Sequence, residues 1–569
     1  MGFYKIKIIA VLAFLLFSDL SFASGYKQSL SLFNDSKYKN GFKNFDYVNA
    51  DASKGGEVRF GVEGGFNSLN KFILKGISAS GLSYLYDSLM EDSQDEVSVM
   101  YPLIAKSVLY NRKNSFMIFR LNPKARFHDG VYISSDDVVF TFNKLIKDGH
   151  PTYKLIFRDV NNVEKLGKHL VKFDFKGSNN RDLPFAIASL PVLPKHYYES
   201  NDFSKTTLTP PLGSGPYKIT EVEPNHSVTY ERVSDYWAKD LAVNRGRYNF
   251  GEISYDYYHD NSVLVEAFKS QKYDFRQENV ARNWASAYDI EAVEKGSILK
   301  KKISHSLPAP MQAFILNLRK AKFADVNLRK ALTYAFDFEW LKKHIFYGSY
   351  KRTQSFFENS DFSFKEFKLP KGSDDGFNRK NLIAAQDILE ESGYVLKDDF
   401  LYDKNGKKVE IEFLITQKTF EMVIAPFVKN LRKLGIDAKA KFVEENQYKT
   451  RVNNFDYDVI VGMFGQALIP GNELYAYFHS SQKDIKGSRN LMGLNNKEVD
   501  YLVEQIIKSK RKKDLSRLCI KLDSILLENH YLIPQWYSGN YRILHRNIFG
   551  IPKKHAKYSL SLDSWWINN

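Results

Sequence analysis

Strand-like and helix-like segments follow one another along almost the whole chain, and this mixing constrains the fold more than any other feature. Residues 57–62 alternate apolar and polar side chains and run into Glu63-Gly64-Gly65, the pattern of a strand that opens into a tight loop. Residues 326–347 repeat apolar side chains at helical spacing. With 569 residues, the chain is long enough for more than one hydrophobic core. We therefore expect an α/β protein with more than one domain.

Capping, turn and stop residues place further elements. Ser134 or Ser135 can cap a helix, because Asp136 and Asp137 follow in its first turn. The other expected elements are a hairpin of residues 108–110 and 116–121, a helix over 381–392 before Gly393, a strand over 410–416, a helix over 422–434 before Gly435, strands over 436–443 and 458–463, and a surface excursion over 359–379. Both halves of the chain therefore contain strands and helices of their own.

The N-terminal segment has the pattern of a secretory signal peptide. Lys5 and Lys7 precede an apolar run over residues 8–17, and Ser21-Phe22-Ala23 offers small residues for cleavage. The run is shorter than the roughly 20 residues that span a bilayer. No cysteine lies near the cleavage site to carry a lipid. We expect residues 1–23 to be removed and the mature chain to be a free periplasmic protein.

Composition and motif spacing argue against several other classes of protein. The formal net charge is +16, but Lys and Arg are spread along the chain, and the densest run, 508–513, lies between two helical patterns. We expect no nucleic-acid partner. The histidines form no pair at metal-binding spacing, and Gly213-Ser214-Gly215 lacks the first glycine of a nucleophile elbow. We therefore assign no catalytic residue, metal site or cofactor. Cys519 is the only cysteine, and its apolar helical setting predicts a buried thiol.

Sequence blocks spread over the chain resemble one family. Arg126-Phe127-His128-Asp129-Gly130, followed by Asp137-Val138-Val139-Phe140-Thr141, resembles the signature of family 5 extracellular solute-binding proteins. Further blocks are similar to its YejA-like branch: residues 45–49, 193–197, 211–217, 243–250, 273–279 and 534–537. The resemblance runs from about Phe42 to Trp566. Long blocks in the right order are more specific than any single motif.

The resemblance implies a two-lobed periplasmic-binding-protein fold of type II, in the large peptide-binder class, with two crossover strands as a hinge. The lobes would close on a ligand, and the crossings would fall near Met311–Leu318 and Pro534–Ile543. The implied division is a signal peptide over 1–23, a first lobe over 24–305 plus 534–569 with an inserted subdomain at about 70–205, and a second lobe over 306–533.

Three loops combine glycine or backbone access with aromatic and amide groups, which suits the main chain of a peptide. One follows the strand at 57–62, one lies at 276–288, and one ends the strand at 458–463. Together with one residue from each implied crossing, the candidate ligand-binding residues are Glu63, Phe66, Asn67, Arg282, Asn283, Trp284, Tyr288, Gln312, Phe464, Gly465, Gln466 and Trp536.

The charge of the expected site departs from the oligopeptide binders. The family holds the peptide amino terminus with an aspartate just after the strand equivalent to residues 457–463, whereas this chain has Phe464-Gly465-Gln466-Ala467-Leu468 there. Either Glu63, Glu473 or another carboxylate takes that role, or the ligand has no free ammonium. Glu63 is the first candidate, because two glycines after it let a ligand approach the main chain.

The resemblance implies a monomeric, non-catalytic protein that captures oligopeptides or peptide-like compounds for an ABC transporter. Its partners would be an inner-membrane permease and a cytoplasmic ATPase. One alternative keeps the class but changes the ligand to an opine, a glycoside or a metal chelate. A second is an exported hydrolase, which would need a nucleophile and base or a carboxylate pair that we do not recognise. A third is a periplasmic chaperone or scaffold.

Overall fold

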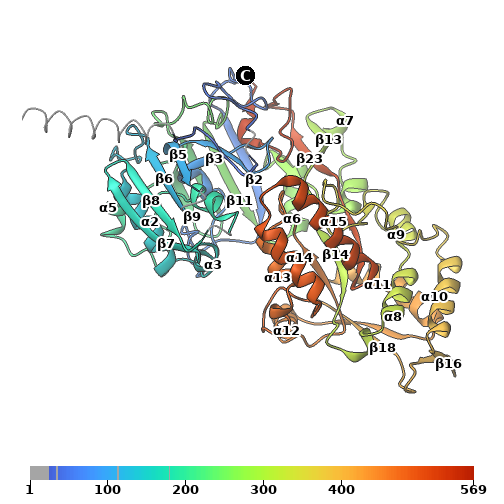
Figure 1. Ribbon diagram of the computed structural model, residues 1–569. Coiled ribbons are helices and arrows are strands. Elements are labelled where there is room, and N and C mark those ends of the chain that lie inside the picture. The colour runs from blue at the N-terminus through green and yellow to red at the C-terminus, as the bar shows by residue number, and fades with distance from the viewer. Residues whose placement is uncertain (1–24, 34–35, 112–114, 178–179, 569) are drawn as a thin grey trace, which may run out of the picture. The chain divides into compact units, whose positions relative to one another are not determined.

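The computed structural model describes residues 25–33, 36–111, 115–177 and 180–568 (Figure 1). The expected signal peptide and residues 112–114 of the expected hairpin turn lie outside the described residues. The chain forms two compact units. Unit 1 comprises Met1–Arg276, Lys295–Leu299 and Leu544–Asn569, and unit 2 comprises Gln277–Glu294 and Lys300–Ile543. The implied lobe boundaries at 305/306 and 533/534 differ from this division.

Unit 1 is built mainly on a seven-stranded sheet in the order β13-β23-β12-β2-β11-β10-β9. Its strands are β2 (Glu57–Glu63), β9 (Tyr217–Glu223), β10 (Ser227–Arg232), β11 (Glu252–Tyr258), β12 (Phe275–Gln277), β13 (Ile298–Ser304) and β23 (Asn540–Arg546). The strand expected over residues 57–62 is confirmed as β2, which pairs in parallel with β11 and β12. Helix α6 (Asn261–Lys269) begins after Asp260, whose carboxylate accepts the N–H groups of Ser262 and Val263.

Three strands of this sheet, β12, β13 and β23, cross a boundary between the two units. β23 overlaps the crossing expected at Pro534–Ile543, whereas Met311–Leu318 lies within unit 2. The latter segment forms β14 (Met311–Leu316), a strand in the interior of the sheet of unit 2. Its almost continuous burial explains the difference, because an uninterrupted apolar run is typical of a strand covered on both faces.

A second, four-stranded antiparallel sheet of unit 1 has the order β5-β6-β8-β7. Its strands are β5 (Ala105–Asn111), β6 (Phe116–Leu121), β7 (Val160–Gly167) and β8 (Leu170–Phe175), and the helices of this region are α2 (Ser135–Asp148), α3 (Thr152–Ile156), α4 (Leu183–Ala188) and α5 (Lys195–Tyr198). The expected hairpin is confirmed as β5 and β6. The predicted cap of α2 is confirmed too, since the backbone N–H and Oγ of Ser134 both donate to Asp137 Oδ2 at 2.9 Å.

Unit 1 also contains two smaller sheets. They are formed by β1 (Leu30–Ser31), β3 (Met90–Asp92) and β4 (Val99–Pro102), and by β24 (Phe549–Gly550) with β25 (Trp566–Ile567). The Arg247 guanidinium, 4% exposed, pairs with Glu91 at 2.8 Å and with Asp563 near the C-terminus. Phe45 and Tyr47 are fully buried in a neighbouring aromatic cluster. Two blocks of the YejA-like pattern, 45–49 and 243–250, therefore contribute to the core of this unit.

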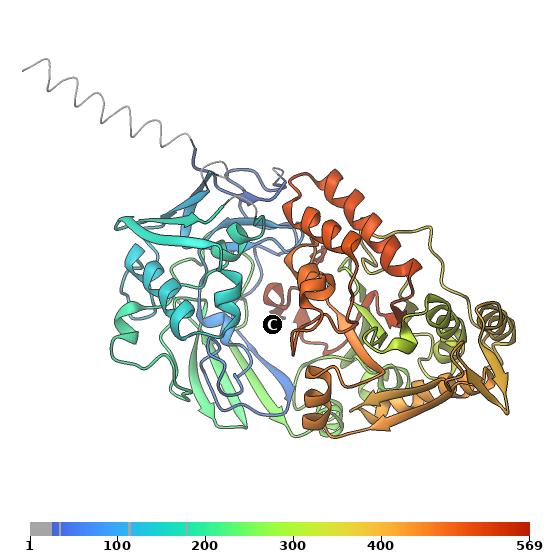
Figure 2. The same ribbon diagram turned by 60° about the horizontal axis from the view of Figure 1, so that its bottom comes forward.

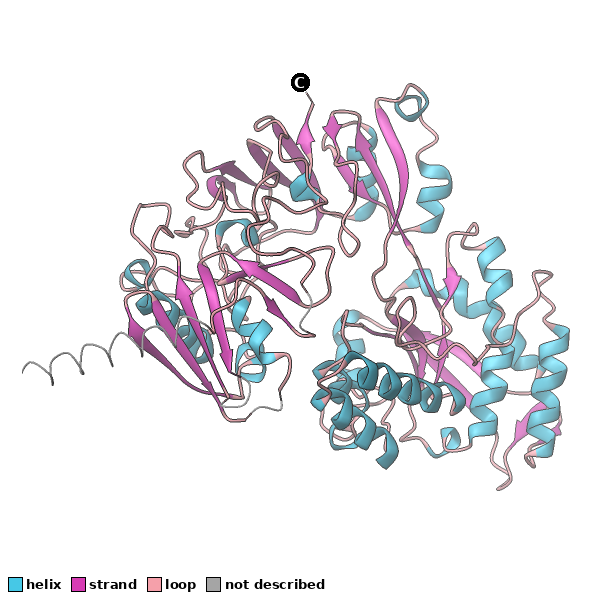
Figure 3. Ribbon diagram, turned by 45° about the horizontal axis from the view of Figure 1, so that its top comes forward, coloured by secondary structure: helices cyan, strands magenta, loops and turns pink. Residues whose placement is uncertain are grey.

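Unit 2 is an α/β layer structure around a five-stranded sheet in the order β19-β18-β20-β14-β21. Besides β14, the strands of this sheet are β18 (Glu410–Ile415), β19 (Asp437–Phe442), β20 (Val459–Phe464) and β21 (Leu532–Pro534). Its helices are α7 (Glu291–Glu294), α8 (Val326–Ala335), α9 (Phe338–His344), α10 (Arg379–Glu391), α11 (Glu421–Lys433), α12 (Glu445–Asn453), α13 (Asn472–Phe478), α14 (Lys497–Lys508) and α15 (Lys512–Glu528). Helices α13, α14 and α15 form one group and α8, α10 and α11 another (Figures 1 and 2). Figure 3 distinguishes the helices from the strands by colour.

The helix expected over residues 326–347 is two helices, α8 and α9. The break falls at Phe336-Asp337, where the Asp337 side chain accepts the N–H of Trp340 at 3.1 Å and so caps α9. The other expected elements of unit 2 are confirmed as α10, β18, α11, β19 and β20. Gly393 and Gly435 follow the ends of α10 and α11 with φ of 80° and 76°, a backbone conformation that favours glycine.

The basic run at 508–513 joins α14 and α15, as expected for a solvated helix–helix joint. Cys519 lies on α15 and is fully buried, as its apolar setting predicts. None of the helices among the described residues has both the length and the apolar composition that a membrane span requires.

Candidate functional site

The register of the unit 2 sheet brings several predicted residues to one end of the sheet. β14 and β20 are antiparallel, with Met311 opposite Phe464 and Gln312 opposite Met463. The start of β14 therefore lies beside the end of β20, where Phe464, Gly465 and Gln466 leave the sheet. Phe464 is fully buried, with its ring 5.2 Å from that of Tyr477. A side chain added at Gly465 would meet only the Tyr477 hydroxyl within 4 Å, so space is open beside this backbone.

Side-chain amides at this end of the sheet have unused hydrogen-bonding capacity. Gln312 Nε2 donates to Gln535 Oε1 at 2.8 Å, and the backbone N–H of Gln535 donates to the Gln312 carbonyl at 2.9 Å. Gln535 is fully buried, yet its Nε2 has no partner among the described residues. Gln466 leaves both its Nε2 and its Oε1 shielded from solvent and without a described partner. Such groups cost about 1–3 kcal/mol each when nothing satisfies them.

An aromatic cluster surrounds Trp536. This residue lies in β22 (Trp536–Tyr537), which pairs with β15 (Lys351–Arg352). The half-buried Trp536 ring has its centroid 4.3 Å from Phe346, 6.2 Å from Tyr350 and 6.4 Å from Phe420. Phe346 is buried, whereas the Trp536, Tyr350 and Phe420 side chains are half-buried, and aromatic rings of this kind can receive ligand side chains.

Arginine side chains border this cluster and are donors only. Arg542 lies 5.0 Å from the centre of the Tyr350 ring and donates from Nη2 to the Tyr350 hydroxyl at 3.1 Å. Its Nη1 is shielded and has no partner among the described residues. Arg352, opposite Trp536 in the strand pair, likewise leaves Nε and Nη2 without described partners. Burial lowers the pKa of Arg352 to about 10, so the side chain is still a cation at neutral pH.

The predicted residues of the 276–288 loop enclose one buried carboxylate of unit 2. The Tyr288 hydroxyl donates to Glu278 Oε2 at 2.5 Å, and Asn283 Nδ2 donates to the same oxygen at 3.4 Å. Tyr288 is fully buried, and Trp284 is 8% exposed with Lys300 Nζ 5.0 Å from its ring centre. Arg282 is exposed on the same turn. These contacts order the loop, and Arg282 has the greatest freedom to reach a ligand.

In unit 1, the predicted loop after β2 contains one exposed acid and two residues with structural contacts. Glu63 is exposed, and its carboxylate forms no hydrogen bond or ion pair with another described residue. Gly64 has φ of 91° and open space where a side chain would stand. Phe66 is 1% exposed, with its ring 4.8 Å from Tyr257. Asn67 Oδ1 accepts the N–H of Ile77 at 2.7 Å. Phe66 and Asn67 hold the loop, whereas Glu63 and the glycines leave it accessible.

Four residues at the unit 2 cluster are not among the predicted site residues, namely Tyr350, Arg352, Gln535 and Arg542. Gln535 stands inside one of the family-like blocks, directly before Trp536, and that adjacency is a usable signal. Tyr350 and Arg352 have no local signal, since only the pairing of β15 with β22 brings them to Trp536.

Solved binding proteins share this fold. The oligopeptide-binding protein AppA from Bacillus subtilis, solved with a nonapeptide, matches 91% of this chain and all of its own chain, with a TM-score of 0.68 at 22% identity. NikA from Brucella suis, solved with Fe(III)-EDTA, matches 90% of this chain and all of its own, with a TM-score of 0.72 at 17% identity. The fold is that of the two-lobed type II periplasmic binding proteins.

Sequence comparison then defines the family. The model for bacterial extracellular solute-binding proteins, family 5 Middle, matches residues 99–485. The "Probable peptide-binding protein YejA" of Agrobacterium fabrum is 37% identical, over 95% of this chain and 94% of its own length. The chain belongs to family 5 of the bacterial extracellular solute-binding proteins, within the YejA-like branch. The family resemblance seen in the sequence blocks is thereby confirmed.

Proposed function

We propose that this protein captures oligopeptides or peptide-like compounds and delivers them to an ABC importer without converting them chemically. The observation that carries the proposal is the set of unpaired amide and guanidinium groups around Gln466, Gln535 and Arg542, next to the Trp536 cluster. Peptide carbonyls are acceptors that match unpaired donors, and aromatic walls suit side chains of varied shape. The name of the Agrobacterium relative and the nonapeptide solved with AppA point to the same ligand class.

We infer the partners and the location from the family. The protein would work as a monomer in the periplasm, released from its signal peptide over residues 1–23 and without a lipid anchor. It would pass its ligand to an inner-membrane permease that a cytoplasmic ATPase drives. Sequencing the N-terminus of exported protein tests the location. Retention of residues 1–23 on membrane-bound protein would contradict it.

Mass spectrometry of ligands that co-purify with the protein tests the ligand class. Protein isolated without added ligand is denatured, and the released small molecules are analysed. A ladder of mixed peptides is the expected result, because recognition through the main chain tolerates many side chains. A single opine, glycoside or metal chelate would instead support the non-peptide alternative. NikA, which has the same fold, was solved with the metal chelate Fe(III)-EDTA.

A paired substitution tests the site separately from the ligand class. Trp536→Ala should cost about 2 kcal/mol or more of peptide binding, as buried aromatic anchors do. Tyr501→Ala is the control, because Tyr501 is 62% exposed on α14, outside the cluster. Isothermal titration with one defined peptide measures both variants. Unchanged affinity in a folded Trp536→Ala protein would remove the cluster from the binding site.

A further inference from the structure

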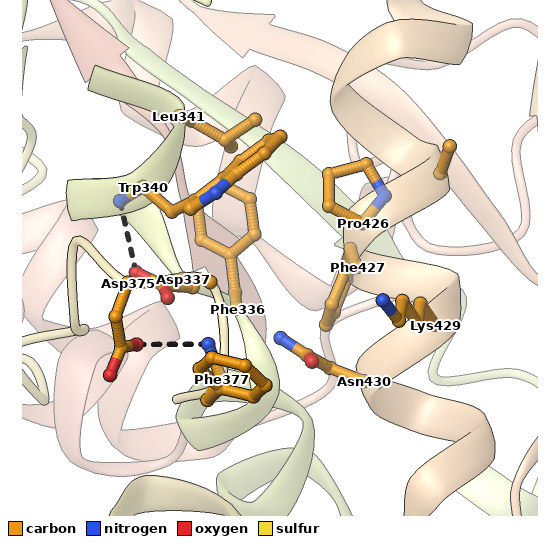
Figure 4. A pocket seen from close by; sticks show the side chains of 12 residues that line it. Phe336, Asp337, Trp340, Leu341, Asp375, Phe377, Pro426, Phe427, Lys429 and Asn430 are labelled. Atoms are coloured by element: carbon orange, nitrogen blue, oxygen red, sulfur yellow. Dashed lines mark hydrogen bonds between the residues drawn. The ribbon is translucent and has the colours of Figure 1, made fainter. Parts of the chain in front are cut away.

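Unit 2 has a pocket whose lining contains none of the residues discussed above as ligand contacts. It lies between the α8–α9 junction, the loop at 372–377 and helix α11, and has a volume of about 420 Å³ (Figure 4). Its walls are mainly apolar and aromatic, formed by Phe336, Trp340, Leu341, Phe377, Pro426 and Phe427. Trp536, Gln466 and Arg542 do not line it. A ligand in this pocket would therefore contact different residues from a peptide bound at the Trp536 cluster.

One buried carboxylate in the pocket wall lacks a full set of partners. Asp337 is 7% exposed, and its Oδ1 accepts the N–H of Trp340. Its Oδ2 is shielded from solvent and has no hydrogen-bond partner among the described residues. Asp375, at the pocket rim, and the buried Arg352, which does not line the pocket, act on this carboxyl group by their charges, and the Ser373 backbone amide acts on it as well. A buried carboxylate oxygen is costly unless a donor reaches it.

The loop that closes the pocket is fitted closely to this acid and to Trp340. A Cβ at Gly372 would lie 2.1 Å from Asp337 Oδ1, and one at Gly376 would lie 2.8 Å from Trp340 Nε1. Gly376 also has φ of 77°. Only glycine allows the loop to approach so closely. By contrast, Phe377 is 67% exposed and extends the aromatic wall toward solvent.

We propose that this pocket is a second binding site, for small organic ammonium compounds with an apolar or aromatic body. The ammonium would donate to Asp337, and the body would lie among the rings of Phe336, Trp340 and Phe377. Aromatic faces attract cations, so the walls and the acid favour the same charge. Lys429 also lines the pocket, but it is exposed and its ammonium can remain in water.

Binding of 2-phenylethylammonium tests the proposal, with 2-phenylethanol as the neutral probe of matched shape. Titrations follow the indole resonances of the full-length protein, one of which belongs to Trp340. The amine should bind saturably and about tenfold or more tightly than the alcohol, because only the amine can pair with Asp337. No saturable binding up to the solubility of the amine, or equal affinity for both probes, would overturn the proposal.

Matched variants locate the site. Asp337→Asn keeps an oxygen for the Trp340 N–H and should abolish the preference for amine over alcohol. Asp375→Asn, which removes an exposed acid from the rim, should retain that preference. Phe377→Ala changes an exposed side chain, so the variant should fold. It should bind both the amine and the alcohol more weakly. A preference that survives in Asp337→Asn, or amine binding that disappears in Trp536→Ala, would place the amine elsewhere.

Discussion

At the scale of single residues, Gln466 and Gln312 differ in how their side-chain amides are satisfied. Both polar atoms of the Gln466 amide are shielded and unpaired among the described residues. The Gln312 amide is instead hydrogen-bonded, because its Nε2 donates to Gln535 Oε1 at 2.8 Å. Gln312 lies on β14 and Gln466 lies two residues beyond the end of the adjacent β20, and the two amides should respond oppositely to substitution.

Gln466→Leu should leave the free energy of unfolding unchanged or raise it, because unsatisfied polar atoms are replaced by an apolar group of similar size. The same change should weaken peptide binding by about 1–3 kcal/mol, since the ligand loses the group that pairs with its main chain. Gln312→Leu should instead destabilise the protein, because Gln535 loses a partner. Urea unfolding and calorimetric titration measure both quantities. A large loss of stability in Gln466→Leu would show that the amide serves the fold.

Glu63 gives a prediction about the ligand's charge. If its carboxylate pairs with the peptide ammonium in the complex, Glu63→Gln should cost about 2–5 kcal/mol of binding. N-acetylated peptide should bind the wild type poorly and distinguish less between the two proteins. Asp129→Asn is the control, because Asp129 Oδ1 accepts the N–H of Val131 in a turn and should affect stability more than affinity. Equal affinities for both peptides in both proteins would exclude Glu63 as the anchor.

At the scale of elements, the link between α15 and β21 contains a buried histidine with an unusual backbone. His530 is 7% exposed and has φ of 47°. Its Nδ1 lies 3.1 Å from Thr333 Oγ1 on α8. Burial, reinforced by the charges of Lys330 and Arg329, lowers the pKa of His530 from 6.5 to about 4. Folding therefore keeps this imidazole neutral over a range in which the unfolded chain binds a proton.

The lowered pKa sets the sign of a pH effect on stability. As the pH falls below 6.5, protonation of the histidine favours the unfolded chain, so the contribution of His530 to the free energy of unfolding decreases. The contribution is fully lost only near pH 4, where folded His530 also titrates. The contribution is about 3 kcal/mol at most. His530→Asn tolerates the positive φ and cannot titrate, so its unfolding free energy should fall less than that of the wild type.

Urea unfolding of both proteins between pH 7 and pH 4 provides the measurement. Asp87 and Asp523 also titrate here, because burial raises the pKa of Asp87 to about 7 and that of Asp523 to about 6. Their effect has the opposite sign, since each raised pKa favours folding at low pH. It is common to both proteins and cancels in the comparison. Parallel curves would contradict the role assigned to His530.

Elements whose ends depend on local chemistry could be predicted from the sequence. α10 and α11 end before Gly393 and Gly435, and a positive-φ glycine after a helix is a local signal. The junction of α8 and α9 had a local signal too, in Asp337, but the apolar repeat across it favours one continuous helix. The structure shows that the cap prevails over the repeat, because the Asp337 side chain takes the N–H of Trp340.

The proposed binding cluster could be predicted only in part. Gln312, Phe464 and Gln466 were selected, and strand register brings them together. The neighbours of Trp536 depend on the pairing of β15 with β22, which are far apart in sequence and too short to show a pattern. Phe66 and Tyr288 were selected for their aromatic character, but the structure buries both. Residue type alone does not distinguish an aromatic ring in the core from one that faces a ligand.

At the scale of the whole molecule, neither unit is one continuous piece of chain. Unit 1 takes residues from both ends and from 295–299, and Arg247 pairs with Asp563 within it. A chain that ends before residue 544 would leave Arg247 buried without this partner, and the sheet without the end of β23. The two units must therefore be studied in the full chain, and ligand effects on stability are best measured there.

Binding without turnover is the property that separates the proposed function from the hydrolase alternative. A ligand that binds only the folded state raises its free energy of unfolding by RT ln(1 + [L]/Kd), about 2.7 kcal/mol at a hundredfold excess over Kd. The midpoint temperature of thermal unfolding, measured by calorimetry, should therefore rise with the logarithm of peptide concentration in the wild type. It should rise much less in Trp536→Ala. Mass spectrometry after prolonged incubation should recover the peptide intact. Cleaved product that accumulates at a steady rate in wild type would identify an enzyme, whereas a midpoint unaffected by any peptide would shift the ligand to a non-peptide solute.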